Sequence, residues 1–316
     1  MCMQERMINF LYFFLPVLGG YTLTSVYLLK NPQILHRKKR PAFYCKKIAH
    51  RGGSGERIES TMEAFTHAAE QGTEMLEMDC HLTHDGFVVV SHDENLLRQT
   101  GHDVTISSLN LQDLPLYKER LEVTFYEGRY STGKDRKFAL LEDVFKKFPE
   151  MPISIEIKEN NHELIKRVSD LVKRYNREGI TVWASADSTI MKQCWKMNGS
   201  MPYSFTMSRG LLLLLLFYTG LLPFVPIGES LLQFYLMRIF NSLCFILNLL
   251  LSCCHCRITM RKSLFRHLAA RGIQVHLFVC NTEEDIEAAL EVGATGVMSD
   301  YPTLLSSYFC KNRSQD

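Results

Sequence analysis

Beyond residue 44 the sequence alternates short apolar or β-branched runs with longer segments of amphipathic, helical periodicity. This alternation is typical of parallel strands joined by crossover helices, because a parallel connection needs a dozen or more residues. Such runs predict eight strands, at residues 45–50, 74–79, 87–92, 152–158, 180–185, 202–207, 274–280 and 296–300. The pattern therefore predicts an α/β protein with a TIM (β/α)8 barrel.

Most of the connections between these strands have the length and periodicity of a helix. The predicted helices lie at residues 61–71, 141–148, 162–176, 189–197, 261–271 and 283–292. The second connection differs, because Thr83-His84-Asp85-Gly86 has turn chemistry and leaves no room for a helix. We therefore expect one irregular step in the barrel.

The composition is that of an ordinary globular protein of 316 residues, 46% of them hydrophobic, so collagen-like and disordered chains are excluded. Lys and Arg exceed Asp and Glu by only 36 to 34, which gives a net charge of +2. Binding of nucleic acid is typical of a clear basic excess or a basic face. No nucleic-acid partner is expected.

An uncharged segment at the amino terminus, residues 8–29, would span about 33 Å as a helix, enough to cross a bilayer. A cleaved signal peptide is the alternative, but the run is long for one and Tyr27-Leu28-Leu29-Lys30 lacks small residues for cleavage. Residues 1–44 are therefore predicted to be a membrane anchor and basic linker. The basic run at residues 36–40 favours a cytosolic barrel by the positive-inside rule.

A second apolar region, residues 208–259, follows the predicted sixth strand and interrupts the barrel domain at 45–310, ahead of a tail at 311–316. Within it, residues 211–227 are uncharged but contain Gly220, Pro223 and Pro226, which disfavour a spanning helix. We expect a hydrophobic insertion that forms a re-entrant or interfacial lid. A plain membrane anchor is the alternative.

Acidic residues gather at the carboxyl ends of two predicted strands. Residues two apart in a strand point to the same side, so Glu77 and Asp79 converge, as do Glu156 and Lys158. Adjacent carboxylates repel unless a cation neutralises them, so three convergent acids suggest a hard divalent metal, either calcium or magnesium. Salt-bridged strand ends are the alternative for each pair taken alone.

The first four predicted strands all end in polar or ionisable residues, and barrel active sites form at that end. His50-Arg51-Gly52 follows the first strand, and His92-Asp93 follows the third. Either histidine alone could be a satisfied histidine at a strand end. The coincidence along four strands favours a catalytic site.

Six blocks in this order resemble the glycerophosphodiester phosphodiesterase family: His50-Arg51-Gly52-Gly53, 59–65, Leu76-Glu77-Met78-Asp79, 89–96, Glu156-Ile157-Lys158 and 296–302. The resemblance covers about residues 45–308. With the anchor and the insertion, the chain looks most similar to membrane-bound members that act as lysophospholipases D. Two positions depart from the family pattern: Glu59-Ser60-Thr61 replaces the usual Glu-Asn-Thr, and Phe278 replaces an aromatic that is commonly Trp.

The resemblance implies a metal-dependent phosphodiesterase that converts lysophospholipids such as lysophosphatidylcholine to lysophosphatidic acid and the head-group alcohol. N-acyl glycerophosphoethanolamine-type lysolipids are a second expected substrate, and an endoplasmic-reticulum and perinuclear membrane is the expected location. Calcium is favoured as the metal, with magnesium the alternative. The roles implied are metal ligation by Glu77, Asp79 and Glu156, general acid and base catalysis by His50 and His92, and phosphate contact by Arg51 and Lys158.

Two rival functions differ from this expectation. A glycerophosphodiesterase would act on water-soluble glycerophosphodiesters, but the apolar insertion disfavours it. A catalytically silent, membrane-tethered lipid-binding protein would have no need of two acid–base histidines around a metal site.

Overall fold

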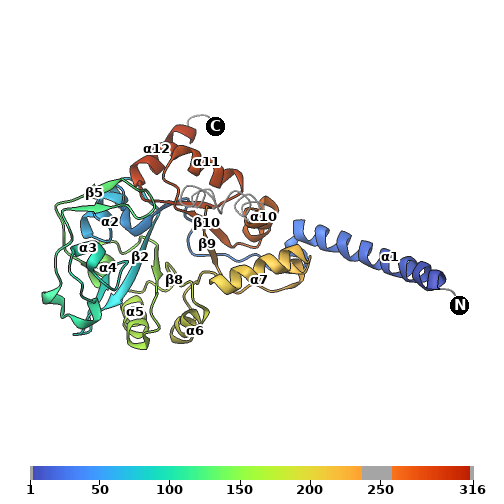
Figure 1. The fold of residues 1–316 in the computed structure, drawn as a ribbon, viewed down its shortest axis with the longest axis horizontal. Helices are drawn as coiled ribbons and strands as arrows, with labels where there is room; N and C mark the ends of the chain where they lie inside the picture. Colours follow the sequence, from blue (N-terminus) through green and yellow to red (C-terminus); the bar gives the residue numbers. More distant parts are fainter. Residues whose placement is uncertain (1–2, 237–257, 314–316) are drawn as a thin grey trace.

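The computed structural model describes residues 3–236 and 258–313. Its centre is a curled sheet of mainly parallel strands with helices packed around it (Figure 1). The strands of this TIM-like α/β barrel are β1 (Lys47–Ala49), β2 (Met75–Leu82), β7 (Ile153–Glu156), β8 (Thr181–Ala184), β9 (Leu231–Tyr235), β10 (Gln274–Phe278) and β11 (Gly296–Ser299).

The parallel pairings run around the sheet and return to their start. One series joins β11 to β1, β2, β7 and β8, and the other joins β9 to β10 and β11. Two bridges close the gap between β8 and β9, one from Trp183 to Tyr203 and one from Ser204 to Leu231. The carboxyl ends of these strands consequently meet at one mouth, as the sequence predicts.

The prediction that residues 87–92 form a barrel strand is wrong. This segment contains β3 (Val88–Val90), which pairs antiparallel with β2 and with β6 (Ala139–Leu140). The turn before β3 explains the difference, because Gly86 has a φ of +85° and its N–H donates to Thr83 O over 3.0 Å. A tight turn of this kind joins antiparallel strands and cannot serve as a parallel crossover.

Another strand takes the place of residues 87–92 in the barrel, and it lies inside the region predicted to be an insertion. The described part of residues 208–259 contains most of α7 (Met207–Tyr218), the short 3-10 helix η5 (Leu222–Phe224) and β9. Because β9 pairs with β10 over five residues, the region supplies part of the barrel itself. The predicted strand at 202–207 makes only the two bridges, and residues 237–257 of the predicted insertion lie outside the described residues.

All six predicted helices are present, with ends that differ by no more than two residues. The helices that surround the sheet are α2 (Met62–Glu70), α4 (Leu141–Lys147), α5 (His162–Arg174), α6 (Ser188–Met197), α10 (Lys262–Ala270), α11 (Glu283–Glu291) and α12 (Pro302–Arg313). The last of these continues past residue 310, the predicted end of the barrel domain.

The excursion between β3 and β6 lies beside the mouth and is largely irregular. It contains α3 (Leu97–Thr100), the 3-10 helices η3 (Ile106–Ser108) and η4 (Leu111–Asp113), and the hairpin of β4 (Arg120–Glu122) and β5 (Tyr130–Thr132).

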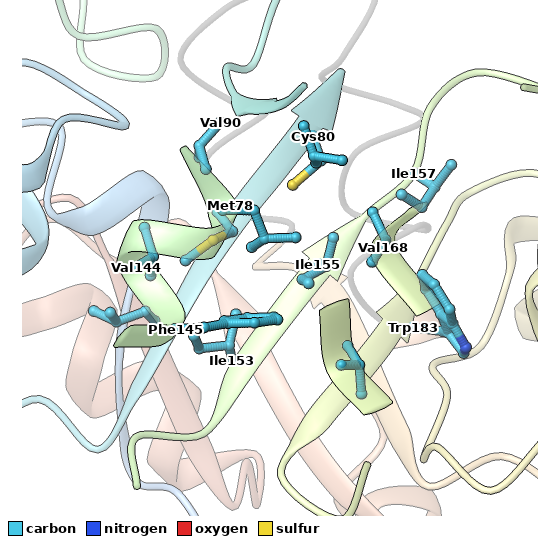
Figure 2. Close-up of a cluster of buried hydrophobic side chains, with 14 of the residues drawn as sticks. Met78, Cys80, Val90, Val144, Phe145, Ile153, Ile155, Ile157, Val168 and Trp183 are labelled. Atoms are coloured by element: carbon cyan, nitrogen blue, oxygen red, sulfur yellow. The ribbon is translucent and has the colours of Figure 1, made fainter. Parts of the chain in front are cut away.

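Strand β2 separates the packed core from the interior of the barrel. Met78 and Cys80 point into the layer between the sheet and the helices, where they join Ile155 of β7 and Phe145 of α4 (Figure 2). Full burial of such an apolar side chain contributes about 1.5–3 kcal/mol. The alternate residues of β2 therefore face the barrel interior on a strand held rigidly from behind.

One helix in the described residues, α1 (Met3–Lys30), is long and apolar enough to cross a membrane. Its window at Tyr12–Lys30 has a mean hydropathy of 1.4 and is 6% buried. The helix projects away from the barrel beside α7 (Figure 1). A 3-10 helix, η1 (Pro32–Ile34), follows it, and His267 Nδ1 of α10 donates to Leu29 O over 2.8 Å.

Candidate active site

Three carboxylates meet inside the mouth of the barrel because β2 and β7 are parallel neighbours in register. Asp79 is paired directly with Glu156, and Glu77 lies two residues earlier on the same face of β2. One oxygen from each of the three side chains lies within 4.8 Å of the others. The convergence predicted from the spacing of these acids is therefore present in the structure.

The charges of this cluster are poorly compensated. Burial and the charge of Asp79 raise the pKa of Glu156 to about 7, and the same two causes raise the pKa of Glu77. Asp79 is 1% exposed, and within the described residues its Oδ2 accepts no hydrogen bond. Three crowded carboxylates with an oxygen that lacks a partner fit a divalent cation with oxygen ligands.

Lys158 is the nearest cation to this cluster. Its Nζ lies 2.6 Å from Asp79 Oδ1, and its side chain is 30% exposed at the mouth. Burial alone would raise the pKa of Asp79, but the charges of Lys158, His92 and Arg51 hold it below the usual value. The lysine thus reaches both the carboxylates and the open space where a phosphate would bind.

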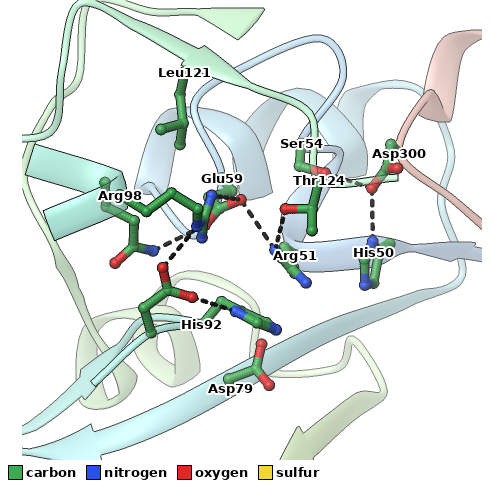
Figure 3. Close-up of polar contacts among 12 residues, drawn as sticks. His50, Arg51, Ser54, Glu59, Asp79, His92, Arg98, Leu121, Thr124 and Asp300 are labelled. Carbon is green, nitrogen blue, oxygen red and sulfur yellow. Dashed lines mark hydrogen bonds and ion pairs between the residues drawn. The ribbon is translucent and has the colours of Figure 1, made fainter. Parts of the chain in front are cut away.

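His50 follows β1 in the short 3-10 helix η2 (His50–Gly52) and is fixed by an acid from the other end of the chain. Its Nδ1 lies 2.6 Å from Asp300 Oδ1, just after β11 (Figure 3). Its Nε2 lies 4.0 Å from Glu77. Burial would lower the pKa of His50, but the Asp300 carboxylate raises it above the usual value. Ser54 and Asn281 also donate to Asp300, so this aspartate is held on several sides.

His92 follows β3 and has an acid of its own. Its Nδ1 lies 2.5 Å from Asp93 Oδ1, and the side chain is 28% exposed. Burial lowers the pKa of His92, although the hydrogen bond to Asp93 opposes the shift. The N–H of the preceding residue, Ser91, donates to Asp79 O over 3.0 Å. This backbone bond to β2 holds His92 at the mouth. Both histidines thus have one ring nitrogen fixed by an aspartate.

A buried ionic chain links the two sides of the mouth (Figure 3). Glu59 lies between Arg51 at 3.2 Å and Arg98 at 2.5 Å, and Arg98 Nε donates to Asp93 over 2.6 Å. Burial would raise the pKa of Glu59, but the two guanidinium groups lower it to about 2. The sequence shows that Glu59 and Arg98 are charged, but it does not reveal which residues they pair with.

The backbone at Arg51 follows an unusual path that brings its guanidinium into this chain. Arg51 has a φ of +49°, and Gly52, with a φ of +78°, lies so close to α2 that a Cβ would stand 2.7 Å from Phe65. Arg51 N–H donates to Glu77 over 2.9 Å. The turn therefore presents both the backbone and the side chain of Arg51 to the carboxylate cluster.

A second group of metal-capable side chains lies next to the first one. His81 Nδ1 is 2.6 Å from Glu159 and 3.2 Å from Glu94. Burial would lower the pKa of His81, but these two carboxylates raise it to about 9. A protonated imidazole between two acids needs no metal, so we interpret this group as a tie between the segments that carry His92 and Lys158.

One cavity of about 670 Å³ contains all seven site residues predicted from the sequence. Its lining combines the acids, the histidines, Arg51 and Lys158 with Leu211, Leu213 and Leu214 of α7. An aromatic group stands beside His50, with Tyr235 and Phe278 in contact at 4.3 Å between ring centroids. The cavity therefore brings charged and apolar side chains together in one space.

The chain is similar to known proteins in both sequence and fold. The sequence profile of the Glycerophosphoryl diester phosphodiesterase family matches residues 50–304. The chain is 50% identical over 303 residues to human Lysophospholipase D GDPD3, covering 94% of this chain and 95% of that protein. It is 48% identical over 310 residues to human Lysophospholipase D GDPD1, covering 94% of this chain and 96% of that protein.

The fold is also similar to that of solved structures. The glycerophosphoryl diester phosphodiesterase domain of a Mycobacterium tuberculosis protein superposes with a TM-score of 0.63 at 16% sequence identity. The match covers 84% of this chain and 99% of that domain. At this identity the likeness concerns the fold alone.

Proposed function

The chain belongs to the glycerophosphoryl diester phosphodiesterase family and is a phosphodiesterase, and from this premise we propose that it is a lysophospholipase D. Its substrates are lysophospholipids such as lysophosphatidylcholine, and N-acyl glycerophosphoethanolamine-type lysolipids. Hydrolysis of lysophosphatidylcholine gives lysophosphatidic acid and choline. An N-acyl glycerophosphoethanolamine has its acyl group on the head group, so it gives a glycerol phosphate and an N-acylethanolamine.

A single observation carries the choice of substrate. The cavity that holds the carboxylates and the histidines continues along α7, where Leu211 and Leu214 line it. A water-soluble glycerophosphodiester has nothing to place against these side chains. A lysolipid has an acyl chain, and burial of each methylene contributes about 0.8 kcal/mol.

The cation is held by Glu77, Asp79 and Glu156, with calcium favoured over magnesium. When bound, it neutralises these acids and attracts the charged phosphate oxygens of the substrate. Arg51 and Lys158 line the same cavity and stabilise the oxygens that gain charge in the transition state.

The two imidazoles divide the proton transfers. One accepts the proton of the nucleophile, and the other donates a proton to the leaving alcohol. Asp300 and Asp93 fix the ring orientation of His50 and His92 through Nδ1, which leaves each Nε2 for this exchange. The nucleophile is water or the free glycerol hydroxyl of the lysolipid, and the hydroxyl would give a cyclic phosphate first.

The proposed organisation places residues 1–44 in a membrane anchor and basic linker, 45–310 in the catalytic domain and 311–316 in a tail. The protein resides in the endoplasmic-reticulum and perinuclear membrane, either with a single span or with an additional re-entrant segment. The basic run at 36–40 favours a cytosolic barrel, whereas a calcium enzyme would find more of its ion in the lumen. Protease protection of a carboxyl-terminal tag in sealed microsomes distinguishes the two orientations.

The deciding experiment offers the full chain in detergent two substrates, lysophosphatidylcholine and glycerophosphocholine, with calcium or magnesium. We expect choline release from the lysolipid with either ion above the metal-free rate, and a higher rate with calcium. Hydrolysis of glycerophosphocholine alone would favour the glycerophosphodiesterase. Choline release from neither substrate would favour the silent lipid-binding protein.

Substitutions on α7 test the apolar lining of the cavity. Leu211→Gln and Leu214→Gln should reduce hydrolysis of lysophosphatidylcholine and spare any hydrolysis of glycerophosphocholine. Leu212→Gln is the matched control, because Leu212 lies on the same helix but does not line the cavity. An equal loss of both activities in the first two variants would reject the assignment of α7 to the acyl chain.

A further inference from the structure

The carboxyl end of α7 is hydrogen-bonded to the candidate membrane helix. Tyr21 Oη donates to Thr219 O over 2.5 Å, and Ser25 Oγ donates to Gly220 O over 2.6 Å. These carbonyls follow the last residue of α7, where a helix has no amide of its own to offer them. Two hydroxyls of α1 therefore cap α7.

The two segments approach closely at this point. Gly220 has a φ of +75°, and a Cβ there would lie 2.8 Å from Ser25 Oγ and 3.1 Å from Tyr21 Oη. Ser25 is 6% exposed, and the ring of Tyr21 stacks with Phe224 at 6.5 Å between centroids. The contact between α1 and the end of α7 is therefore closely packed and includes specific hydrogen bonds.

The length of the uncharged segment sets the depth of this contact in a bilayer. A span needs about 20 residues, and residues 8–29 supply 22 without charge. Every stretch of about 20 residues within that segment includes both Tyr21 and Ser25. If α1 crosses the membrane, the end of α7 is therefore inside the hydrocarbon, where no water can satisfy Thr219 O and Gly220 O.

The side chains of α7 agree with such a position. Leu215 and Tyr218 of α7 are 59% and 50% exposed on the described surface, and Leu221, which follows the helix, is 44% exposed. At the amino end of the same helix, Met207 and Gly210 line the catalytic cavity. The helix consequently joins the cavity to the surface that α1 would place in the bilayer.

We propose that α1 and α7 form one membrane-inserted unit, in which Tyr21 and Ser25 hold α7 in the leaflet at the entrance of the catalytic cavity. A lysolipid then passes along α7 from the leaflet to the active site without entering water. The amino-terminal helix positions the entrance as well as anchoring the protein. This inference rests on the proposed action on lysolipids.

The first test uses the full chain in phosphatidylcholine vesicles with a photo-crosslinking p-benzoylphenylalanine at position 215. We expect mass spectrometry to find phosphatidylcholine attached at this position. The same amino acid at position 87, which is an exposed Phe on the turn before β3, serves as the control and should capture none. Absence of lipid at position 215 in the otherwise unchanged chain would overturn the proposal.

The second test removes the two capping hydroxyls with Tyr21→Phe and Ser25→Ala together. We expect about a tenfold rise in KM for lysophosphatidylcholine in vesicles, equivalent to about 1.4 kcal/mol, with kcat and glycerophosphocholine hydrolysis unchanged. Lipid capture at position 215 should fall as well. The matched control is Tyr27→Phe with Thr22→Val, since Tyr27 is 60% exposed and Thr22 bonds within its own helix to Leu18 O.

The remaining outcomes separate this inference from the proposed function. Wild-type KM and capture in the capping double variant would overturn the inference and leave the lysophospholipase D function standing. If the double variant loses all activity, crosslinking at position 215 in the otherwise unchanged chain decides the matter. If the unchanged protein hydrolyses neither substrate, the proposed function fails, and the lipid capture still tests the helix pair.

Discussion

Lys158 Nζ lies 2.6 Å from Asp79 Oδ1, so the protein's own ammonium group approaches the same carboxylate that we propose as a cation ligand. Like charges repel, and an ammonium at this distance opposes the binding of a divalent cation to Asp79. The same lysine stands where it can contact a phosphate. Its two interactions therefore act in opposite directions on metal and on substrate.

Lys158→Gln separates these effects. We expect turnover to fall by roughly 10² because a charge that stabilises the transition state is lost. Calcium should bind as tightly as in the unchanged protein, or more tightly, when measured by isothermal titration calorimetry. Weaker calcium binding would show that the lysine supports the cation site indirectly.

Loss of a carboxylate should remove both metal and activity. We expect Glu77→Gln, Asp79→Asn and Glu156→Gln each to abolish lysophosphatidylcholine hydrolysis and to weaken calcium binding, because fewer oxygens remain for the ion. Excess chelator should reproduce the effect on the unchanged enzyme. Glu163→Gln, on the exposed start of α5, is the control. Full turnover in chelator would refute a metal-dependent reaction.

The histidines and their aspartates should form a graded series. His50→Ala and His92→Ala remove a proton donor or acceptor and should lower kcat by roughly 10² to 10⁴. Asp300→Asn and Asp93→Asn keep the imidazoles but loosen their orientation, so we expect smaller losses in the same parameter. A circular dichroism melt checks the fold of each variant. A near-wild-type rate in either histidine variant would exclude that residue from the mechanism.

Acid should destabilise the barrel through His276, which is fully buried in β10. Burial lowers the pKa of His276 to about 4, whereas an unfolded histidine titrates near 6.5. Below pH 6.5 the unfolded chain therefore binds a proton that the folded chain does not, and stability falls as the pH drops towards 4.

By pH 5 this loss reaches about 2 kcal/mol. Urea unfolding at pH 7 and pH 5 measures it, and His276→Leu should show a correspondingly smaller difference between the two pH values than the unchanged chain. His102→Gln, at an exposed position, is the control. An equal difference in the unchanged chain and in His276→Leu would contradict a neutral buried His276.

Local patterns in the sequence predict the centre of the site because its geometry is local. Glu77 and Asp79 share a face of β2 by the period of a strand, and parallel neighbours put Glu156 beside them. The sequence also predicts that His92 lies at the mouth, but it assigns the residue to the wrong kind of strand. The residue arrives there at the end of an antiparallel strand, and no barrel strand carries it.

The remaining features depend on contacts that a single sequence does not reveal. β9 lies within a region of few charges, and its five mainly apolar residues have no periodic pattern that distinguishes a buried strand from a membrane segment. Asp300 is 250 residues from His50, and Glu59 is 39 residues from Arg98. Pairings over such separations follow no period in the sequence, so the charged residues can be recognised but their partners cannot be predicted.

The neighbouring positions of β1 and β11 bear on the biosynthesis of the protein. Ala49 pairs with Ser299, and the residue after Ser299 is Asp300, the partner of His50. Ribosomes add about 5–20 residues per second, so the first strand waits on the order of 10 to 50 s for the last one. During that interval the nascent chain has neither a closed barrel nor the contact between His50 and Asp300. The site is therefore completed only after translation has nearly ended, and a chain truncated before residue 300 would lack both the partner of His50 and the end of β11.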